Sequence, residues 1–337
     1  MRLLLHAPNV NSGGGLLLLD RLIGESQEKI SWAQLDSRVK NSELQLRALS
    51  PVFIKNSLPS RILAEWRLSV VSKADDIVLC FHGLPPFFTV RGRVVVFVQN
   101  RLLIDGSRLD RFPWRTRLRL LGERFWLRQR KHYATRYVVQ TPSMAALLEG
   151  FLGSGIDISI SSFVPLLQYE TGQEQHSQFD FVYVASGDAH KNHLNLFSAW
   201  ELLFKDGCQP SLALTLDPLI DAKLCSEINR LAHQGLKISN LGKLSHDQVQ
   251  DLYRCSSALI YPSLSESMGL PLIEAQMFAL EIVASERDYV RDVVIPVETF
   301  DPCSPVSIAR AVRRFLKNSD AVIEIGGAEK FVSDILR

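Results

Sequence analysis

The chain has 337 residues, of which 46% are hydrophobic and 22% are charged, and its formal net charge is +2. This length predicts two domains with large cores, and the small net charge argues against a protein that binds nucleic acid over its whole surface. The five scattered cysteines favour a reducing compartment, and no stretch reaches the roughly 18 apolar residues of a spanning helix, so we expect a cytoplasmic protein or one lying on the inner face of the plasma membrane.

The chain opens with a predicted strand, Arg2 to Ala7, and a glycine-rich segment, Asn9 to Gly15. An apolar helix should follow from about Leu16 to Ile23. Glycine has no Cβ, so the backbone of such a loop can approach a ligand closely. The GxGxxG pattern is absent, however, and a plain flexible turn is the alternative.

Polar residues follow two further predicted strands, Asp76 to Phe81 and Arg93 to Val98. His82 comes directly after the first, and Gln99 and Asn100 after the second. Ligands bind at the carboxyl ends of the strands in an open parallel sheet. These three side chains are therefore candidates for contacts to a ligand, with a purely structural histidine as the alternative for His82.

The most basic part of the chain is the segment 108–136. Four apolar residues recur there at helical spacing, Trp114, Leu118, Leu121 and Phe125, and seven cations crowd the other faces, Arg115, Arg117, Arg119, Arg124, Arg128, Arg130 and Lys131. Such a helix could lie on an anionic membrane or meet an acceptor's diphosphate. The alternative is a helix with an apolar core face and a solvated basic face. Nucleic acid is disfavoured because the aromatic residues fall on the apolar stripe.

Strands and helices then alternate to the end of the chain, which predicts two doubly wound parallel sheets of the Rossmann-like α/β class. The polar stretch from Gln168 to Gln178 divides them. We expect an amino-terminal domain at 1–168, a linker at 169–178, a carboxyl-terminal domain at 179–318, and a last helix at 319–337.

The stretch Tyr261 to Ser285 carries the chemistry. It predicts a strand end, a loop with Glu266, and a helix from about Pro271. Proline suits the first turn of a helix, so the amides near Gly269 and Leu270 are open to an anion at a positive helix end. Glu274 lies one turn further and could accept hydrogen bonds from hydroxyl groups beside that anion.

Two glutamates separated by seven residues, with GLP between them, resemble the signature of retaining glycosyltransferases of family four, which have the GT-B fold. The resemblance implies two Rossmann-like domains that face each other across a cleft, with the last helix crossing back to the first domain. It implies that Glu266 contacts the transferred sugar, that Gly269 and Leu270 hold the diphosphate, and that Glu274 holds the ribose. Gly14 and Gly15 would lie against donor phosphate or acceptor, and His82, Gln99 and Asn100 would lie on the side of the sugar or acceptor.

The loop after the strand at Phe179 to Val184 resembles the family's phosphate-binding loop. Lys191 matches the family's lysine and, with Gly187 and Asn192, would contact the donor. Ser186 stands where the family usually has an arginine. The His190-Lys191-Asn192 run resembles a subset that also lacks this arginine, typical of surface-polysaccharide enzymes. Asn240 would lie in the segment that packs against the nucleotide base.

No two aspartates are separated by one residue, which disfavours the metal-dependent transferases, so we expect no metal and no cofactor. The resemblance implies a retaining transfer of a hexose or deoxyhexose from a nucleotide diphosphate sugar, GDP- or UDP-linked. The acceptor would be a growing, lipid-linked surface glycan such as O-antigen or capsule. The alternatives are a sugar-nucleotide epimerase or hydrolase and a non-catalytic nucleotide-sugar-binding protein.

Overall fold

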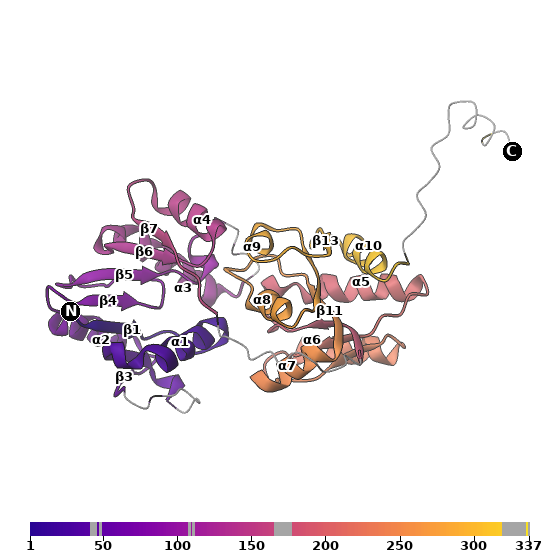
Figure 1. Ribbon diagram of the computed structural model, residues 1–337, viewed down its shortest axis with the longest axis horizontal. Coiled ribbons are helices and arrows are strands. Elements are labelled where there is room, and N and C mark those ends of the chain that lie inside the picture. Colours follow the sequence, from indigo (N-terminus) through magenta and orange to yellow (C-terminus); the bar gives the residue numbers. More distant parts are fainter. Residues whose placement is uncertain are drawn as a thin grey trace.

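The computed structural model describes residues 1–40, 46, 49–106, 109, 112–164, 177–318 and 335. They form two α/β domains that lie side by side along the long axis of the molecule (Figure 1). The expected linker and the expected last helix lie outside the described residues, apart from Ser177, Gln178 and Ile335.

The amino-terminal domain is built on a seven-stranded parallel sheet in the order β3-β2-β1-β4-β5-β6-β7. Its strands are β1 (Leu3–Ala7), β2 (Ile30–Asp36), β3 (Val52–Ile54), β4 (Ile77–Cys80), β5 (Arg93–Phe97), β6 (Arg136–Val139) and β7 (Ile158–Ile160). Its α-helices are α1 (Gly13–Ser26), α2 (Leu58–Val71), α3 (Trp114–Gln129) and α4 (Pro142–Leu152). Single 3-10 turns lie at Gln27–Lys29, Ser37–Val39, Arg101–Leu103 and Lys131–Tyr133.

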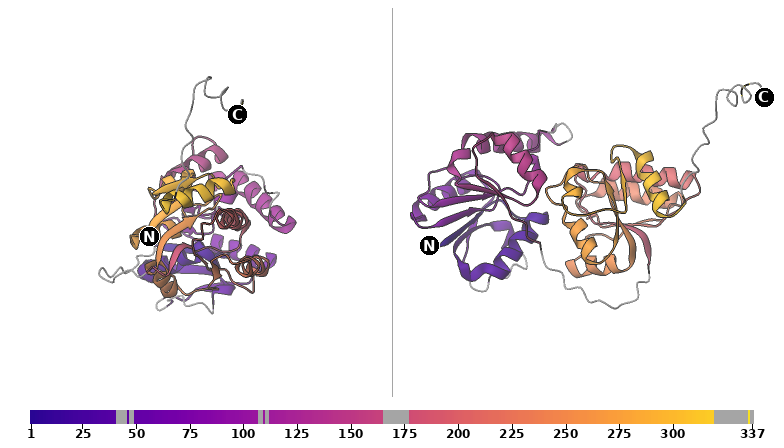
Figure 2. Two further views of the ribbon diagram at one scale, coloured as in Figure 1. Left: turned by 90° about the vertical axis from the view of Figure 1, so that its right-hand side faces the viewer. Right: turned by 45° about the horizontal axis from the view of Figure 1, so that its top comes forward.

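Helices cover both faces of this sheet (Figure 2). On one face, Leu18, Leu19 and Ile23 of α1 pack into a buried cluster. On the other face, a second cluster contains residues of α2, α3 and α4. Each face of a parallel sheet is apolar and has to be covered in this way, which explains the runs of valine and leucine in β1, β4 and β5.

The carboxyl-terminal domain is built on a six-stranded parallel sheet in the order β10-β9-β8-β11-β12-β13. Its strands are β8 (Phe179–Tyr183), β9 (Leu212–Leu214), β10 (Ile238–Asn240), β11 (Ser256–Tyr261), β12 (Glu281–Ser285) and β13 (Glu298–Phe300). Its α-helices are α5 (His193–Lys205), α6 (Ala222–His233), α7 (His246–Arg254), α8 (Leu270–Met277), α9 (Asp288–Arg291) and α10 (Pro305–Phe315), and a 3-10 turn lies at Ala189–Lys191.

Local sequence signals start several of these helices. Thr141 caps α4, and Ser245 forms a capping box with Gln248 at α7. A proline occupies the first turn of α2, α4, α8 and α10. These residues satisfy or remove amides that a helix start leaves free. The start of α8, expected at about Pro271, agrees with the structure to within one residue.

One expectation for the amino-terminal domain was wrong, and one alternative is not supported. The three glycines do not form a loop, because α1 already begins at Gly13 and they make up its first turn. In α3 the apolar stripe does not face the core: Trp114, Phe125 and Leu118 are 64%, 67% and 60% exposed. The helix instead packs through Leu120 and Leu127.

The order of each sheet reverses beside its first strand, between β1 and β4 and between β8 and β11. At such a switch point the loops that follow neighbouring strands diverge and leave a crevice. The two crevices face each other, because residues after β1, β4 and β5 line the same pockets as residues after β8 and β11. Among the described residues, no helix is long and apolar enough to cross a membrane.

Candidate active site

Two adjoining pockets lie between the domains. The glycine pocket, of about 800 Å³, lies between the start of α1 at Gly13, the loop Ser186 to Lys191 and the start of α8 at Gly269. The arginine pocket, of about 670 Å³, lies mainly against the amino-terminal domain and contains Arg38, Arg61, Arg101 and Arg119. Both volumes are in the range of small-molecule sites.

The two pockets share one wall. Its residues come from both domains and line both cavities: Ser12, Gly15, Gln99, His190, Glu266 and Ser267. Groups bound in the two pockets would therefore meet at Glu266. This is the arrangement that a transfer between two substrates requires.

Lys191 and Glu266 form an ion pair at this wall, with 2.6 Å between Nζ and Oε1. Their side chains are 14% and 12% exposed. Burial opposes the charge on Glu266, but Lys191 and His190 outweigh it and lower the pKa of the Glu266 carboxyl. The structure thus places a cation and an anion together at the junction of the pockets.

Tyrosine and backbone contacts hold the Lys191 loop against β11. The Tyr183 hydroxyl donates to the Lys191 carbonyl at 2.8 Å, and the Leu264 amide donates to the His190 carbonyl at 2.8 Å. Asn192 belongs to this support and is not among the residues lining either pocket. Its φ is +64°, and its side-chain amide donates to the carbonyls of Pro262 and Pro302. The structure therefore does not support a donor contact for the Asn192 side chain.

Helix α8 presents its amino-terminal end to the glycine pocket. Gly269 precedes it with a φ of +71°, a conformation that favours glycine. No side chain caps the helix, and Leu270 and Pro271 also line the pocket. The helix start can therefore receive an anion, as the sequence predicts.

Glu274 lies one turn into α8 and lines the same pocket. It is 8% exposed, and the Tyr253 hydroxyl donates to its Oε2 at 2.9 Å. Burial raises the pKa of Glu274. Tyr253 orients the carboxyl group and leaves further acceptor positions for hydroxyl groups of a ligand.

Gly187 allows an aspartate to pack against the loop. A Cβ at this position would lie 2.2 Å from Oδ1 of Asp221, and the Gly187 amide donates to Oδ2 of Asp221 at 3.3 Å. Ser186 also lines the pocket, and its hydroxyl donates to Asp188 at 2.8 Å. The position of the missing arginine is thus taken by a short side chain that is bonded within its own loop.

Asn240 does not line either pocket. Its side chain accepts from the Leu216 amide at 2.9 Å and donates to the Leu216 carbonyl at 3.1 Å. It therefore ties the loops after β9 and β10 together. The pocket is lined in this region by Lys243, Leu244 and His246, just beyond the predicted position.

The three polar residues predicted at the strand ends of the amino-terminal domain do reach the pockets. His82 and Asn100 line the arginine pocket, and Gln99 lines both. The Gln99 Nε2 donates to the Phe81 carbonyl at 2.7 Å, which leaves its buried Oε1 without a hydrogen-bond partner. Asn100 uses its Oδ1 to accept from the Leu102 amide at 3.1 Å.

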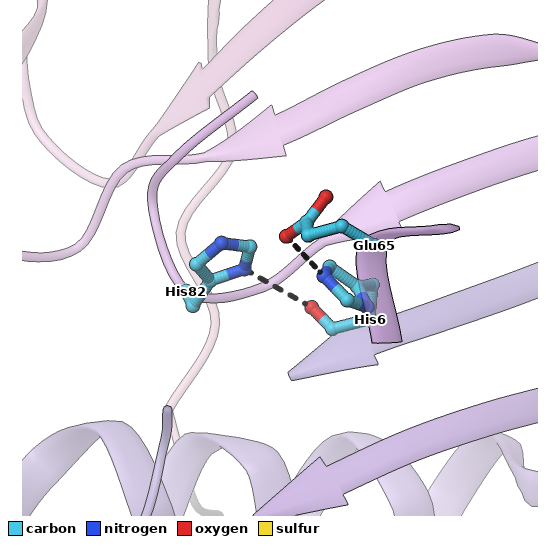
Figure 3. A group of neighbouring side chains, drawn as sticks. All are labelled: His6, Glu65 and His82. Carbon is cyan, nitrogen blue, oxygen red and sulfur yellow. Dashed lines mark hydrogen bonds and ion pairs between the residues drawn. The ribbon is translucent and has the colours of Figure 1, made fainter. Parts of the chain in front are cut away.

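His82 lies beside two buried side chains, His6 and Glu65 (Figure 3). His6 bonds through Nδ1 to Gln34 at 2.8 Å and through Nε2 to Glu65 at 3.0 Å, and the ring of His82 lies 5.1 Å from that of His6. The ligand atoms of His6, Glu65 and His82 lie within 4.8 Å of one another, the spacing of a metal site. Both ring nitrogens of His6 already have protein partners, however, so we interpret this group as a hydrogen-bonded support for His82.

The carboxyl-terminal residues 170–326 match the family model of "Glycosyl transferases group 1". The serotype-specific mannosyltransferase WbdA of Escherichia coli is 26% identical over 209 residues, which cover 57% of this chain and 23% of that protein. The chain thus spans less than a quarter of the length of this curated relative.

Solved structures share the fold of the whole chain. HepE from Anabaena in complex with UDP-glucose has a TM-score of 0.70 and 15% identity over 94% of this chain and 90% of its own. Sucrose-phosphate synthase from Thermosynechococcus elongatus has a TM-score of 0.69 and 15% identity over the same shares. The chain therefore has the GT-B fold of these glycosyltransferases, as the sequence predicts.

The carboxyl-terminal domain supplies the residues that the sequence singles out most clearly, whereas several pocket residues of the other domain were not predicted. Asn9 and Asn11 follow β1 directly, a position at which polar residues point to a site. Arg61 and Arg38 come from α2 and from the turn after β2, both outside the predicted elements. No local spacing relates them to the signature, so only the fold brings them together.

Proposed function

We propose that the chain is a retaining, metal-independent glycosyltransferase of family four. It moves a hexose or deoxyhexose from a nucleotide diphosphate sugar to a growing, lipid-linked surface glycan. The main support is the Lys191–Glu266 ion pair at the wall that the two pockets share, beside the uncapped start of α8. Groups bound in the two pockets can meet at this wall.

In this proposal the glycine pocket holds the donor. Lys191 and the amides at Gly269 and Leu270 bind the diphosphate, and Glu274 accepts hydrogen bonds from the ribose hydroxyls. Glu266 positions the transferred sugar. The UDP-glucose bound by HepE supports a nucleotide sugar, and the activity named for WbdA favours mannose, so GDP and UDP are the first nucleotides to test.

The proposed transfer keeps the configuration of the sugar. The acceptor hydroxyl attacks from the face that the diphosphate leaves, the bond from the anomeric carbon to the β-phosphate oxygen breaks, and the departing phosphate takes the hydroxyl proton. Negative charge grows on that phosphate, where the Lys191 ammonium and the α8 amides would stabilise it. A metal ion is not required for this step in our proposal.

The outer surface of the amino-terminal domain supports a lipid-linked acceptor at the cytoplasmic face of a membrane. On α3, Trp114, Leu118, Leu121 and Phe125 are 52–67% exposed, and Arg115, Arg117 and Arg128 are exposed among them. Exposed aromatic and basic side chains on one helix favour the interface of an anionic bilayer. Helix α2 adds Ile62, Leu63, Trp66 and Val70, which are 42–63% exposed.

Calorimetric titration with GDP, UDP, dTDP and ADP tests the proposal. We expect one nucleotide to bind clearly more tightly than the other three. Glu274→Ala should weaken that binding by about tenfold or more, because hydrogen bonds to a charged group are worth about 1.5–3 kcal/mol. Glu281→Ala, at the exposed start of β12, is the matched control and should change nothing.

Donor turnover completes the test. We expect the wild-type protein to consume the nucleotide sugar whose nucleotide it binds, and to transfer the sugar to a lipid-linked glycan. Donor consumption that needs no glycan would indicate an epimerase or hydrolase. Binding without turnover would indicate a non-catalytic protein, and both results would overturn the proposed transfer.

A further inference from the structure

We infer that the arginine pocket binds a phosphate or diphosphate group carried by the acceptor, with Arg61 as its main ligand. This inference rests on the proposed function, because it assigns the second substrate of the same cleft. Three guanidinium groups line this pocket. They come from three separate elements: Arg38 from the turn after β2, Arg61 from α2 and Arg119 from α3.

Arg61 is held in place without being neutralised. One of its terminal nitrogens donates to Oδ1 of Asn9 at 2.6 Å and to Oδ1 of Asn56 at 2.8 Å. Its Nε is buried and has no hydrogen-bond partner. Within the described part of the chain, no carboxylate lies at ion-pair distance from it. Two neutral amides therefore orient a cation whose charge and Nε donor stay available to a ligand.

Two further arginines line the pocket beside Arg61. Burial lowers the pKa of Arg61; the charges of Asp36 and Glu123 oppose this shift, and those of Arg38 and Arg119 add to it. Arg38 is paired with Asp36, at 2.7 Å, while Arg119 lies 3.6 Å from Glu123 and is 53% exposed. Arg61 has no such ion-pair partner among the described residues, and phosphate matches the planar fork of arginine.

The position of the pocket indicates which part of the acceptor carries the phosphate. Glu266, where the acceptor hydroxyl would lie in the proposed transfer, lines this pocket together with Arg61 and Arg119. The two arginines belong to α2 and α3, the helices that also carry the exposed apolar residues Trp66 and Trp114. We therefore place the reacting hydroxyl at Glu266 and the phosphate at the arginines, on an acceptor whose apolar tail would contact these two helices.

Two sources could supply the same phosphate chemistry, a lipid-linked phosphate and a free sugar phosphate. The test therefore uses two probes, farnesyl phosphate and glucose 1-phosphate, titrated separately into the wild-type protein. We expect at least one probe to bind. Tighter binding of farnesyl phosphate assigns the site to a lipid-linked acceptor, and tighter binding of glucose 1-phosphate assigns it to a free sugar phosphate.

Variants then locate the binding. Arg61→Gln keeps a side-chain amide beside Asn9 and should weaken phosphate binding by about tenfold to a hundredfold, the usual cost of losing a charge-assisted bond. Arg119→Gln changes an exposed side chain and should weaken it less. Arg67→Gln, on the outer side of the same helix as Arg61, is the matched control and should leave it unchanged.

Titration of the preferred nucleoside diphosphate on the same proteins separates the two proposals. We expect Arg61→Gln to bind the nucleotide as the wild type does, and Lys191→Ala to bind the phosphate probes as the wild type does. A protein that binds nucleotide but neither probe, or whose probe binding survives Arg61→Gln, would overturn this inference. Loss of nucleotide binding alone would count against the proposed function while the phosphate site stands.

Discussion

At the scale of single residues, the charges of Lys191 and Glu266 depend on each other because their side chains lie 2.6 Å apart. A bound diphosphate would compete with Glu266 for the ammonium group of Lys191. Glu266 would then be free to accept hydrogen bonds from the sugar. The ion pair therefore holds both side chains in place at the wall that the two pockets share.

We expect Glu266→Gln to keep nucleotide affinity within about threefold while transfer falls by about a hundredfold or more, as for other groups that act mainly in the transition state. Calorimetry and turnover measured on the same protein would check this. Glu274→Ala should show the opposite pattern, with weaker binding as its main effect. An exchange of these two patterns would contradict the roles assigned to the glutamates.

A second prediction concerns His82 and pH. Burial and the nearby His6 lower the pKa of His82 from 6.5 to about 4, against the opposing charge of Glu65. Between about pH 6.5 and pH 4 the unfolded chain binds a proton here that the folded chain does not. The free energy of unfolding is therefore highest above about pH 6.5. It falls as the pH is lowered towards about 4, because protonation of this histidine favours the unfolded chain.

We expect His82→Gln to flatten this part of the stability profile, measured by urea unfolding at a series of pH values. His193, whose pKa is lowered to about 3, contributes in the same direction. It is present in both proteins, so the difference between the two profiles isolates His82. Parallel profiles would show that His82 titrates normally in the folded protein.

At the scale of elements, α3 has its apolar stripe on the outside. Helical spacing shows that Trp114, Leu118, Leu121 and Phe125 share a face, and the structure confirms that they do. Spacing does not show which face meets the core. That choice is made by Leu120, Leu127 and by Arg124, which donates to the Leu102 carbonyl at 2.9 Å.

We expect the double change Trp114→Ala and Phe125→Ala to lower binding to anionic vesicles by about tenfold or more, because inserting an aromatic ring is worth about 1.5–3 kcal/mol. Flotation with vesicles that contain phosphatidylglycerol would measure it. The free energy of unfolding should change by less than about 0.5 kcal/mol, since both side chains are exposed. Leu194→Ala, also 64% exposed, is the control on the other domain.

The elements also show how far the sequence could be interpreted. In the carboxyl-terminal domain, strands, caps and prolines agree with each other, and the loop of Lys191 and the start of α8 were predicted from them. In the other domain, β2, β3 and α2 were missed, and with them Arg61. Asn192 and Asn240 were assigned to the donor, but their amides satisfy backbone groups instead. An asparagine before a helix or at the end of a strand looks the same in sequence in both roles.

At the scale of the whole molecule, an ion pair joins the two domains beside the site. Arg101 donates from both terminal nitrogens to Asp288, at 3.0 and 2.8 Å, and also contacts the Glu266 carbonyl at 3.4 Å. Further contacts between the domains pass from Thr141 to Ser267 and from the Ser143 amide to Asp292. Arg101 thus connects the relative position of the domains to the loop that carries Glu266.

We expect Asp288→Asn to leave the stability of each domain within about 0.5 kcal/mol, because the Asp288 side chain is 45% exposed and such pairs are weak. The relative position of the domains should nevertheless become less restricted. Small-angle X-ray scattering would detect this as a larger radius of gyration, which the preferred nucleoside diphosphate should reduce again. An unchanged radius would show that the other contacts suffice to hold the domains.

The glycine pocket and the arginine pocket share the residues around Glu266. In the proposed reaction two bound ligands meet at this wall, and each would form part of the other's binding surface. Such contact couples the two affinities. If the first ligand raises the affinity for the second by some factor, the second raises the affinity for the first by the same factor. In kinetic terms, the proposed enzyme should use an ordered or synergistic sequence in which the Kd for each substrate falls when its partner is present.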